Sequence, residues 1–376
     1  MNNSVFLALR YLLHHRVTSV VLIASISMII YLPAAMQVIV ASGERHFRSR
    51  AESTPLIIGL RGSVLDLVLG SVYFDKPHEQ VTRFQQCKRV EEQKLGTPIP
   101  LHLKFAARNC QVVGTTNNYL RFRNLELEKG RHWDMLGECV IGAGVVDRLD
   151  VDVGDWIPVS IQTAFLLDSP PLRLQIVGIC ARTETPDDDA IFVDLDTTWV
   201  IEGLGHGHAQ GAQHGASETA PYTTITRQNV KSFHFHGNRN EFPITAMIVI
   251  PDSTKAQTLL LGQYFSPDET VQIVRPRDVM ESLLKRVVMI RSYLIAIIAV
   301  ISFVTILTMS LVFVLSIRLR RAEIVTMSKI GCSRSGMLFI LGGQIIIILI
   351  AGGSVAATLT IATYAYGPEL ARTFIF

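Results

Sequence analysis

The sequence predicts an α-helical membrane protein with three transmembrane helices and one large mixed α+β domain outside the cytoplasm. Apolar segments at 17–42, 289–317 and 337–365 are each long enough to cross a bilayer, which takes about 20 apolar residues. The polar region 43–288 between the first two segments is too long to be a simple loop. Charged residues still make up 18% of the chain, which fits spans combined with a folded domain rather than spans alone.

The chain begins with a predicted amphipathic helix at 1–16, whose apolar residues recur at helical spacing: Val5, Phe6, Leu9, Leu12 and Leu13. We expect this helix to lie along the inner membrane surface, or else to extend the first span. The apolar run at 17–42 is longer than the core of a signal peptide, so we interpret it as an uncleaved anchor. Pro33 lies inside this segment and predicts a kink.

The region 43–288 is predicted to form two α+β subdomains. Short apolar runs bounded by turn residues predict strands at 110–114, 137–142, 172–179 and 244–250, and periodic stretches predict helices at 254–264 and 277–288. Residues 203–220 are rich in Gly, Ala and His and predict a mobile loop. The carboxylates of 184–189 fall at a turn, which we interpret as solvated rather than as a cation site.

Four of the five cysteines lie in this region. Disulfides can form outside the cytoplasm. We predict a Cys87–Cys110 bridge, which closes a loop of modest length, and the alternative is a set of isolated buried thiols.

Basic residues in short connections predict the orientation of the spans. Arg10 and Arg16 precede the first span, and five basic residues lie in the link 318–336 between the second and third. Because such residues favour the cytoplasmic side, we expect a cytoplasmic N-terminus, an external domain at 43–288 and a short external tail at 366–376. The net charge of +3 and the absence of a long block of like charges argue against nucleic-acid binding.

The third span, 337–365, contains a polar residue and two pairs of glycines. The amide of Gln344 needs partners, which predicts a contact with another helix. Gly342, Gly343, Gly352 and Gly353 would allow a helix to approach closely, or else mark a poorly packed span.

The link 318–336 reads as a basic helix end followed by a short amphipathic helix. Ile324, Met327 and Ile330 fall on one side, and Gly331 can end the helix. Such a segment is rigid and could transmit a displacement from a soluble partner to both spans.

This link resembles the coupling-helix segment of MacB/LolC/FtsX-type ABC permeases, in particular the LolC/DevC-like branch. The matching residues are Arg321, Glu323, Ile324, Gly331, Ser333 and Arg334. Further landmarks match at Val113-Gly-Thr, Glu128-Lys-Gly-Arg and Val151-Asp-Val-Gly-Asp. The family usually has a fourth span after the third, whereas only 366–376 follow here. We therefore expect either a three-span branch of the family or a missing wall that a partner supplies.

The resemblance implies a non-catalytic permease subunit of a bacterial inner membrane complex, with ATP bound and hydrolysed by a separate cytoplasmic ABC ATPase dimer. No Walker A sequence occurs in the chain, and no nucleophilic set stands out. The residues expected to couple to the ATPase are Arg320, Arg321, Glu323, Ile324, Met327, Gly331 and Arg334. The other implied partners are a second permease copy in a homodimer or heterodimer, membrane lipid, and a periplasmic or lipoprotein partner.

The implied function is the extraction or export of a lipid-linked or hydrophobic substrate, driven by motion that the ATPase transmits. One alternative is an FtsX-like regulator that activates an extracytoplasmic enzyme. Another is a metal-linked exporter or sensor that handles Zn or Cu.

Five of the eleven histidines cluster within a short part of the external region: His206, His208, His214, His234 and His236. His234 and His236 form a His-x-His pair, which on a strand places both rings on one face and suits a shared Zn²⁺ or Cu²⁺ ion. The alternative is a solvated loop and two strand histidines with ordinary roles.

Overall fold

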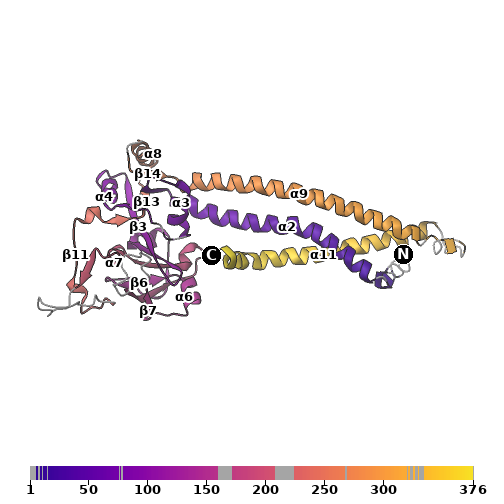
Figure 1. Cartoon of the computed structure of the whole chain (residues 1–376), viewed down its shortest axis with the longest axis horizontal. Helices are drawn as coiled ribbons and strands as arrows, with labels where there is room; N and C mark the ends of the chain where they lie inside the picture. The colour runs from indigo at the N-terminus through magenta and orange to yellow at the C-terminus, as the bar shows by residue number, and fades with distance from the viewer. Residues whose placement is uncertain are drawn as a thin grey trace. The chain divides into compact units, whose positions relative to one another are not determined.

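The computed structural model contains two compact units, which are described separately (Figure 1). The helical unit comprises Met1–His46 and Leu283–Phe376, and the outer domain comprises Phe47–Ser282. The structure describes 16–75, 79–159, 172–207, 224–266, 269–319 and 334–375, together with isolated residues at 6–14, at 77 and at 321–329.

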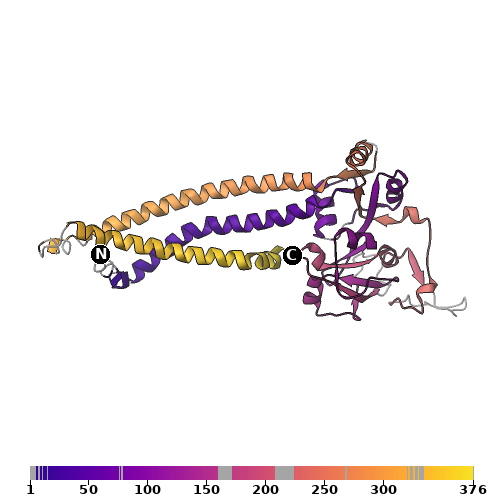
Figure 2. The same cartoon turned by 180° about the vertical axis from the view of Figure 1, so that it is seen from behind.

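Three long helices form the helical unit (Figure 2): α2 (Arg16–Glu52), α9 (Pro276–Leu319) and α11 (Arg334–Ile375). Each contains a stretch long and apolar enough to cross a membrane, at Arg16–Ala41, Ser292–Leu311 and Gly342–Tyr366. The predicted fold class is therefore confirmed. The helices are longer than the predicted spans, because α2 and α9 continue into sequence assigned to the external region, and α11 continues through most of the expected tail.

Helices α2 and α11 pack closely at one of the predicted glycines. The Ser27 hydroxyl donates a hydrogen bond to the Gly352 carbonyl over 3.0 Å. A Cβ atom at position 352 would lie 2.7 Å from Cγ2 of Ile26, so a larger residue would push the helices apart. Gln344 is buried, as predicted for a polar residue that faces another helix.

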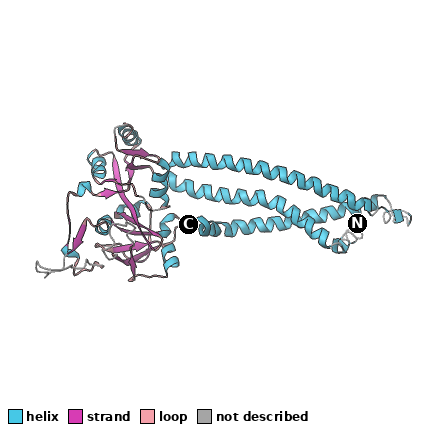
Figure 3. Ribbon diagram, in the orientation of Figure 1, coloured by secondary structure: helices cyan, strands magenta, loops and turns pink. Residues whose placement is uncertain are grey.

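One ten-stranded sheet organises the outer domain, and all described strands belong to this unit (Figure 3). The strand order is β14-β1-β13-β3-β4-β9-β6-β8-β5, with β7 added beside β8. The bounds are β1 Leu56–Leu60, β3 Gly96–Ala107, β4 Cys110–Thr115, β5 Leu127–Gly130, β6 Glu138–Ile141, β7 Trp156–Pro158, β8 Arg173–Cys180, β9 Ala190–Asp194, β13 Ala246–Pro251 and β14 Val271–Val274. The β4–β9 and β6–β8 pairs are parallel, and the other pairs are antiparallel.

Strand β3 joins the two halves of the sheet. Its first half pairs with β13, and its second half pairs with β4. The two prolines at 98 and 100 are two residues apart, so their nitrogens face the same side of the strand. The Pro100 carbonyl accepts a hydrogen bond from Thr115 on the β4 side, which places the prolines' missing N–H groups away from β13.

Two hydrophobic cores lie against this sheet. One contains residues from β1, β13, α4 (Gln85–Glu92) and α8 (Thr254–Gln263), with Trp199 of α7 (Leu195–Ile201). The other is built mainly from strands β3, β4, β6, β7, β8 and β9 and from α6 (Ala143–Leu149). Both cores therefore share one sheet.

Short elements complete the outer domain. They are α3 Val64–Val68, η1 Leu69–Tyr73, α5 Asn117–Phe122, η2 Pro186–Asp189, η3 Val230–Ser232, η4 Arg239–Glu241, the β2–β12 pair (Thr82–Arg83 and Pro243–Ile244) and the β10–β11 pair (Gly205–Gly207 and Phe233–Phe235).

Two sequence predictions fail in this domain. Cys87 and Cys110 are free and buried in different cores, so the predicted disulfide is wrong. The thiol of Cys87 instead lies 3.5 Å from the Met247 sulfur. The turn at 184–189 is not fully solvated either, because Asp187 and Asp188 are buried.

Candidate functional site

The end of α2 is fixed inside the outer domain by a buried ion pair. Nη1 and Nη2 of Arg50 donate to the two oxygens of Asp187 over 2.6 and 2.9 Å. The Tyr119 hydroxyl accepts from Arg50 over 3.1 Å and donates to Asp187 over 2.7 Å. The side chains of Arg50 and Asp187 are only 5% and 3% exposed. We call these three residues the Arg50 cluster.

Local sequence positions the carboxylate of this cluster. Thr185 caps η2 by accepting a hydrogen bond from the Asp187 N–H. The neighbouring Asp188 accepts bonds from the N–H groups of Thr183 and Glu184, which ties the turn to itself. Gly142 is required beside it, since a Cβ atom there would lie 2.2 Å from the Asp187 carbonyl oxygen. The turn therefore presents Asp187 in a fixed orientation.

Electrostatics keep Arg50 and Asp187 ionised. Burial alone would raise the pKa of Asp187, but the charge and hydrogen bonds of Arg50, with further help from Arg123 and Tyr119, hold it below its usual range. Burial would lower the pKa of Arg50, and Asp187 more than offsets this effect, so that pKa is raised. Burial and the adjacent Asp187 raise the pKa of Tyr119 to about 12. Arg50 and Asp187 thus form a charged pair that is almost fully buried.

Further contacts surround the same helix end. Arg123 donates to the hydroxyls of Ser53 and Thr54, which follow α2 directly. The Tyr73 hydroxyl donates to the Phe47 carbonyl in the last turns of α2. The helix end therefore has little freedom to rotate or slide within the outer domain.

Sequence reasoning missed the Arg50 cluster. No prediction was made for Arg50, and Asp187 was interpreted as part of the solvated turn at 184–189. The two residues lie 137 positions apart in the chain, so no local pattern links them. The available signal is the acidic turn itself, in which a Thr-Pro-Asp sequence predicts a capped, ordered helix start.

The predicted ATPase-coupling segment lies mostly outside the described residues. Helix α9 ends at Leu319, and Arg334 is the first residue of α11. Arg321 is helical, whereas the structure does not describe Arg320, Glu323, Ile324, Met327 and Gly331.

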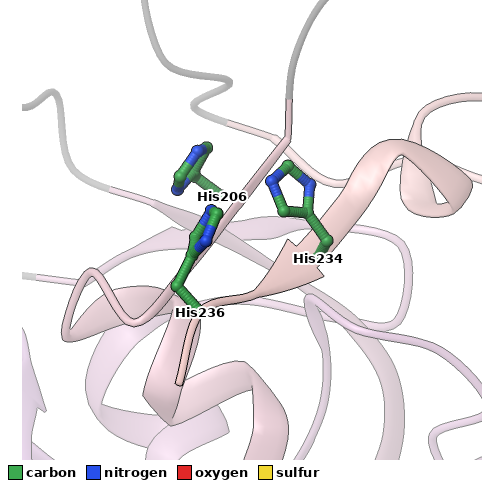
Figure 4. A group of neighbouring side chains, drawn as sticks. All are labelled: His206, His234 and His236. Atoms are coloured by element: carbon green, nitrogen blue, oxygen red, sulfur yellow. The ribbon is translucent and has the colours of Figure 1, made fainter.

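Three of the five predicted histidines come together on the outer domain (Figure 4). His206 of β10 is the direct cross-strand partner of His234 of β11, and His236 follows two residues later. Their nearest ring nitrogens all lie within 4.8 Å of one another. His208 and His214 lie outside the described residues.

Comparison with known proteins identifies the outer domain. Residues 100–228 match the family model of the MacB-like periplasmic core domain. This match supports the predicted MacB/LolC/FtsX-type permease with its α+β domain outside the membrane.

Two solved domain structures match somewhat more than half of this chain at low sequence identity. The periplasmic region of MacB from Actinobacillus actinomycetemcomitans is 11% identical, with 63% of this chain and 97% of that chain covered and a TM-score of 0.37. The extracellular domain of the noncanonic ABC-type transporter YknZ from Gram-positive bacteria is 10% identical, with 58% and 98% covered and a TM-score of 0.34. Among curated proteins, none matches the chain.

The family match has a direct relation to the Arg50 cluster. Asp187 and Tyr119 lie within the matched region 100–228. Arg50 lies near the end of α2, the helix that also contains the first apolar span. The ion pair therefore joins the MacB-like core to the helix that enters it.

Proposed function

We propose that this MacB-like permease subunit, itself non-catalytic, transmits ATP-driven motion from a separate cytoplasmic ATPase to its outer domain. This motion would extract or export a lipid-linked or hydrophobic substrate. The observation that carries the proposal is helix continuity. Helix α2 runs unbroken from the apolar span Arg16–Ala41 to Glu52, and α9 runs unbroken from Pro276 through the span Ser292–Leu311 to Leu319.

Continuous helices suit force transmission because their backbone hydrogen bonds resist bending and stretching, although Pro33 lacks one such bond in α2. A flexible linker between a span and the outer domain would absorb a small displacement before it reached the sheet. The Arg50 cluster prevents such a loss at the end of α2, since the bidentate pair of Arg50 and Asp187 fixes the distance and orientation between α2 and η2.

In this proposal, the link 318–336, which connects the end of α9 to the start of α11, receives the motion of the ATPase. We assign ATPase contact to Arg320, Arg321, Glu323, Ile324, Met327, Gly331 and Arg334, with the N-terminus and this link in the cytoplasm. A second permease copy completes the proposed complex. The span Ser292–Leu311 has no buried residue, which leaves its apolar surface available to that copy or to lipid.

Hydrolysis by the purified complex tests the division of labour. We expect no ATP turnover by this chain alone or by a complex whose ATPase has a disabled Walker motif. Substantial turnover in either preparation would contradict the assignment of a non-catalytic subunit.

Hydrogen exchange in the outer domain tests transmission. Trapping the native complex with ATP should change amide exchange in the turn and strand around Asp187, because that region would receive the displacement of α2. Glu323→Lys should abolish the change while the ATPase still co-purifies, and Asp66→Lys, a charge reversal at an exposed outer-domain residue, should preserve it. An unchanged exchange pattern in the wild-type complex, or the same change with Glu323→Lys, would rule out this route.

A further inference from the structure

The β10–β11 ribbon separates its residues by chemistry onto two faces. His206 and His234 are paired across the strands, and His236 lies two positions beyond His234, so all three fall on the same face. The backbone N–H of His236 donates to the Leu204 carbonyl over 3.1 Å, which extends the ribbon beyond β11. Figure 4 shows the three rings gathered together.

We propose that His206, His234 and His236 form a binding site for a divalent transition metal of the Zn²⁺ or Cu²⁺ class. Neutral imidazole nitrogens are good ligands for both ions. The ring centroids are separated by 4.7 to 4.8 Å, and the nearest ring nitrogens lie within 4.8 Å of one another. Tetrahedral Zn²⁺, with Zn–N bonds of about 2.0–2.1 Å, needs nitrogens about 3.4 Å apart, so side-chain rotations of modest size complete the geometry.

The opposite face of the ribbon anchors it to the domain. Phe235 packs against the core that contains Trp199, and Phe233 packs against the other core. Each phenylalanine covers a glycine on the facing strand: a Cβ atom at Gly205 would lie 2.7 Å from Phe235, and one at Gly207 would lie 2.8 Å from Phe233. The backbone that carries the histidines is therefore held in place before any metal binds, which lowers the entropy lost on ligation.

A hydrogen bond orients one of the rings. Nδ1 of His234 lies 3.2 Å from the carbonyl oxygen of Ser232, and the Ser232 hydroxyl in turn donates to the Asn229 carbonyl over 2.7 Å. When Nδ1 donates its proton to this carbonyl, Nε2 carries the lone pair and becomes the ligand. Backbone carbonyls commonly hold metal-ligating histidines in this way.

Three protein ligands on a solvent-accessible face predict an exchangeable site rather than a closed structural one. Closed structural Zn²⁺ sites supply four protein ligands, whereas three-ligand sites keep one position open for water or another ligand. This inference stands on the ribbon alone and does not depend on the proposed transport function.

Calorimetry on the full chain in detergent, purified with a tag that lacks histidine, tests the site. Titration with Zn²⁺ alone and with Cu²⁺ alone should show about one tight site per chain. His234→Gln combined with His236→Gln should weaken binding by more than about 100-fold, since loss of even a supporting partner costs about 10–100-fold. Tetrahedral absorption of bound Co²⁺ should disappear in the same variant.

Two control variants separate this site from general affinity of histidine-rich sequence. His132→Gln changes an exposed histidine elsewhere and should leave binding unchanged. His208→Gln combined with His214→Gln should also retain the tight site. Absence of a tight site in the wild type, or its loss in either control with retention in the His234/His236 variant, would overturn the proposal.

Discussion

The outer domain places two groups of polar side chains in opposite environments. In the Arg50 cluster, the charged groups are almost fully buried and hydrogen-bonded to one another. In the histidine group on the β10–β11 ribbon, the rings reach solvent, and an apolar face holds the backbone beneath them. The first arrangement holds the end of α2 in the outer domain. The second keeps nitrogen atoms accessible to a ligand while their positions are held.

Removal of one partner from the Arg50 cluster should have the largest effect. Arg50→Met leaves the buried Asp187 carboxylate without its hydrogen-bonded counter-charge, and breaking a buried pair in this way typically costs about 3–5 kcal/mol of unfolding free energy. Arg48→Met is the matched control, because Arg48 lies on the same helix but is half exposed in an i,i+4 pair with Glu52, and it should cost less than about 1 kcal/mol. Denaturant unfolding followed by tryptophan fluorescence reports on this domain, since all three tryptophans lie in it.

A second variant sharpens this result. Arg50→Met combined with Asp187→Leu removes both charges and should be more stable than Arg50→Met alone, because no unpaired charge stays buried. Equal losses for Arg48→Met and Arg50→Met, or a double variant weaker than the single one, would show that the pair is not the dominant contact at the helix end.

Metal should produce the next largest effect. A ligand that binds only the folded protein at about 100 times its dissociation constant adds about 2.7 kcal/mol to stability. Because Phe233 and Phe235 join the ribbon to both cores, Zn²⁺ should raise the unfolding midpoint of the whole outer domain. The increase should be absent with His234→Gln and His236→Gln combined, and an equal increase in that variant would place the metal elsewhere.

Acid should weaken the Arg50 cluster specifically. The pKa of Asp187 is lower in the folded state than its unfolded value of about 3.9. Its contribution is therefore fully present above that unfolded pKa and is lost as pH falls through the lower folded pKa. Wild type should lose more stability than the Arg50→Met, Asp187→Leu variant between about pH 4 and pH 2, as measured by denaturant unfolding at each pH. Parallel pH profiles would show that Asp187 titrates as an ordinary carboxyl.

The sequence predicted features whose determinants are local. Apolar length was enough for the three spans, and an i,i+2 pattern was enough to place His234 and His236 on one face. The pairing of His206 with His234 depends on strand register across an intervening segment, which no local pattern specifies. The same holds for Arg50 and Asp187, which meet only through the tertiary fold.

Strand β3 shows a different reason for a missed element. No strand was predicted at Gly96–Ala107, and the two prolines in this segment would argue against a central strand. The fold accommodates them because the half of β3 that contains them has its hydrogen-bonded neighbour β13 on one side only. The failed Cys87–Cys110 prediction has a related cause, since loop length cannot show that two buried thiols belong to different cores.

Histidine substitutions without metal should have the smallest effect. His234→Gln combined with His236→Gln should change unfolding free energy by no more than about 0.5 kcal/mol in the presence of a chelator, because exposed rings bury little apolar surface. Phe235→Ala is the matched control on the opposite face of the same ribbon, where loss of packing against a core should cost about 1–3 kcal/mol. If the histidine variant were as unstable as Phe235→Ala without metal, the rings would be structural supports of the ribbon. A small loss that grows only when Zn²⁺ stabilises the wild type is the pattern expected of side chains held in place for a ligand.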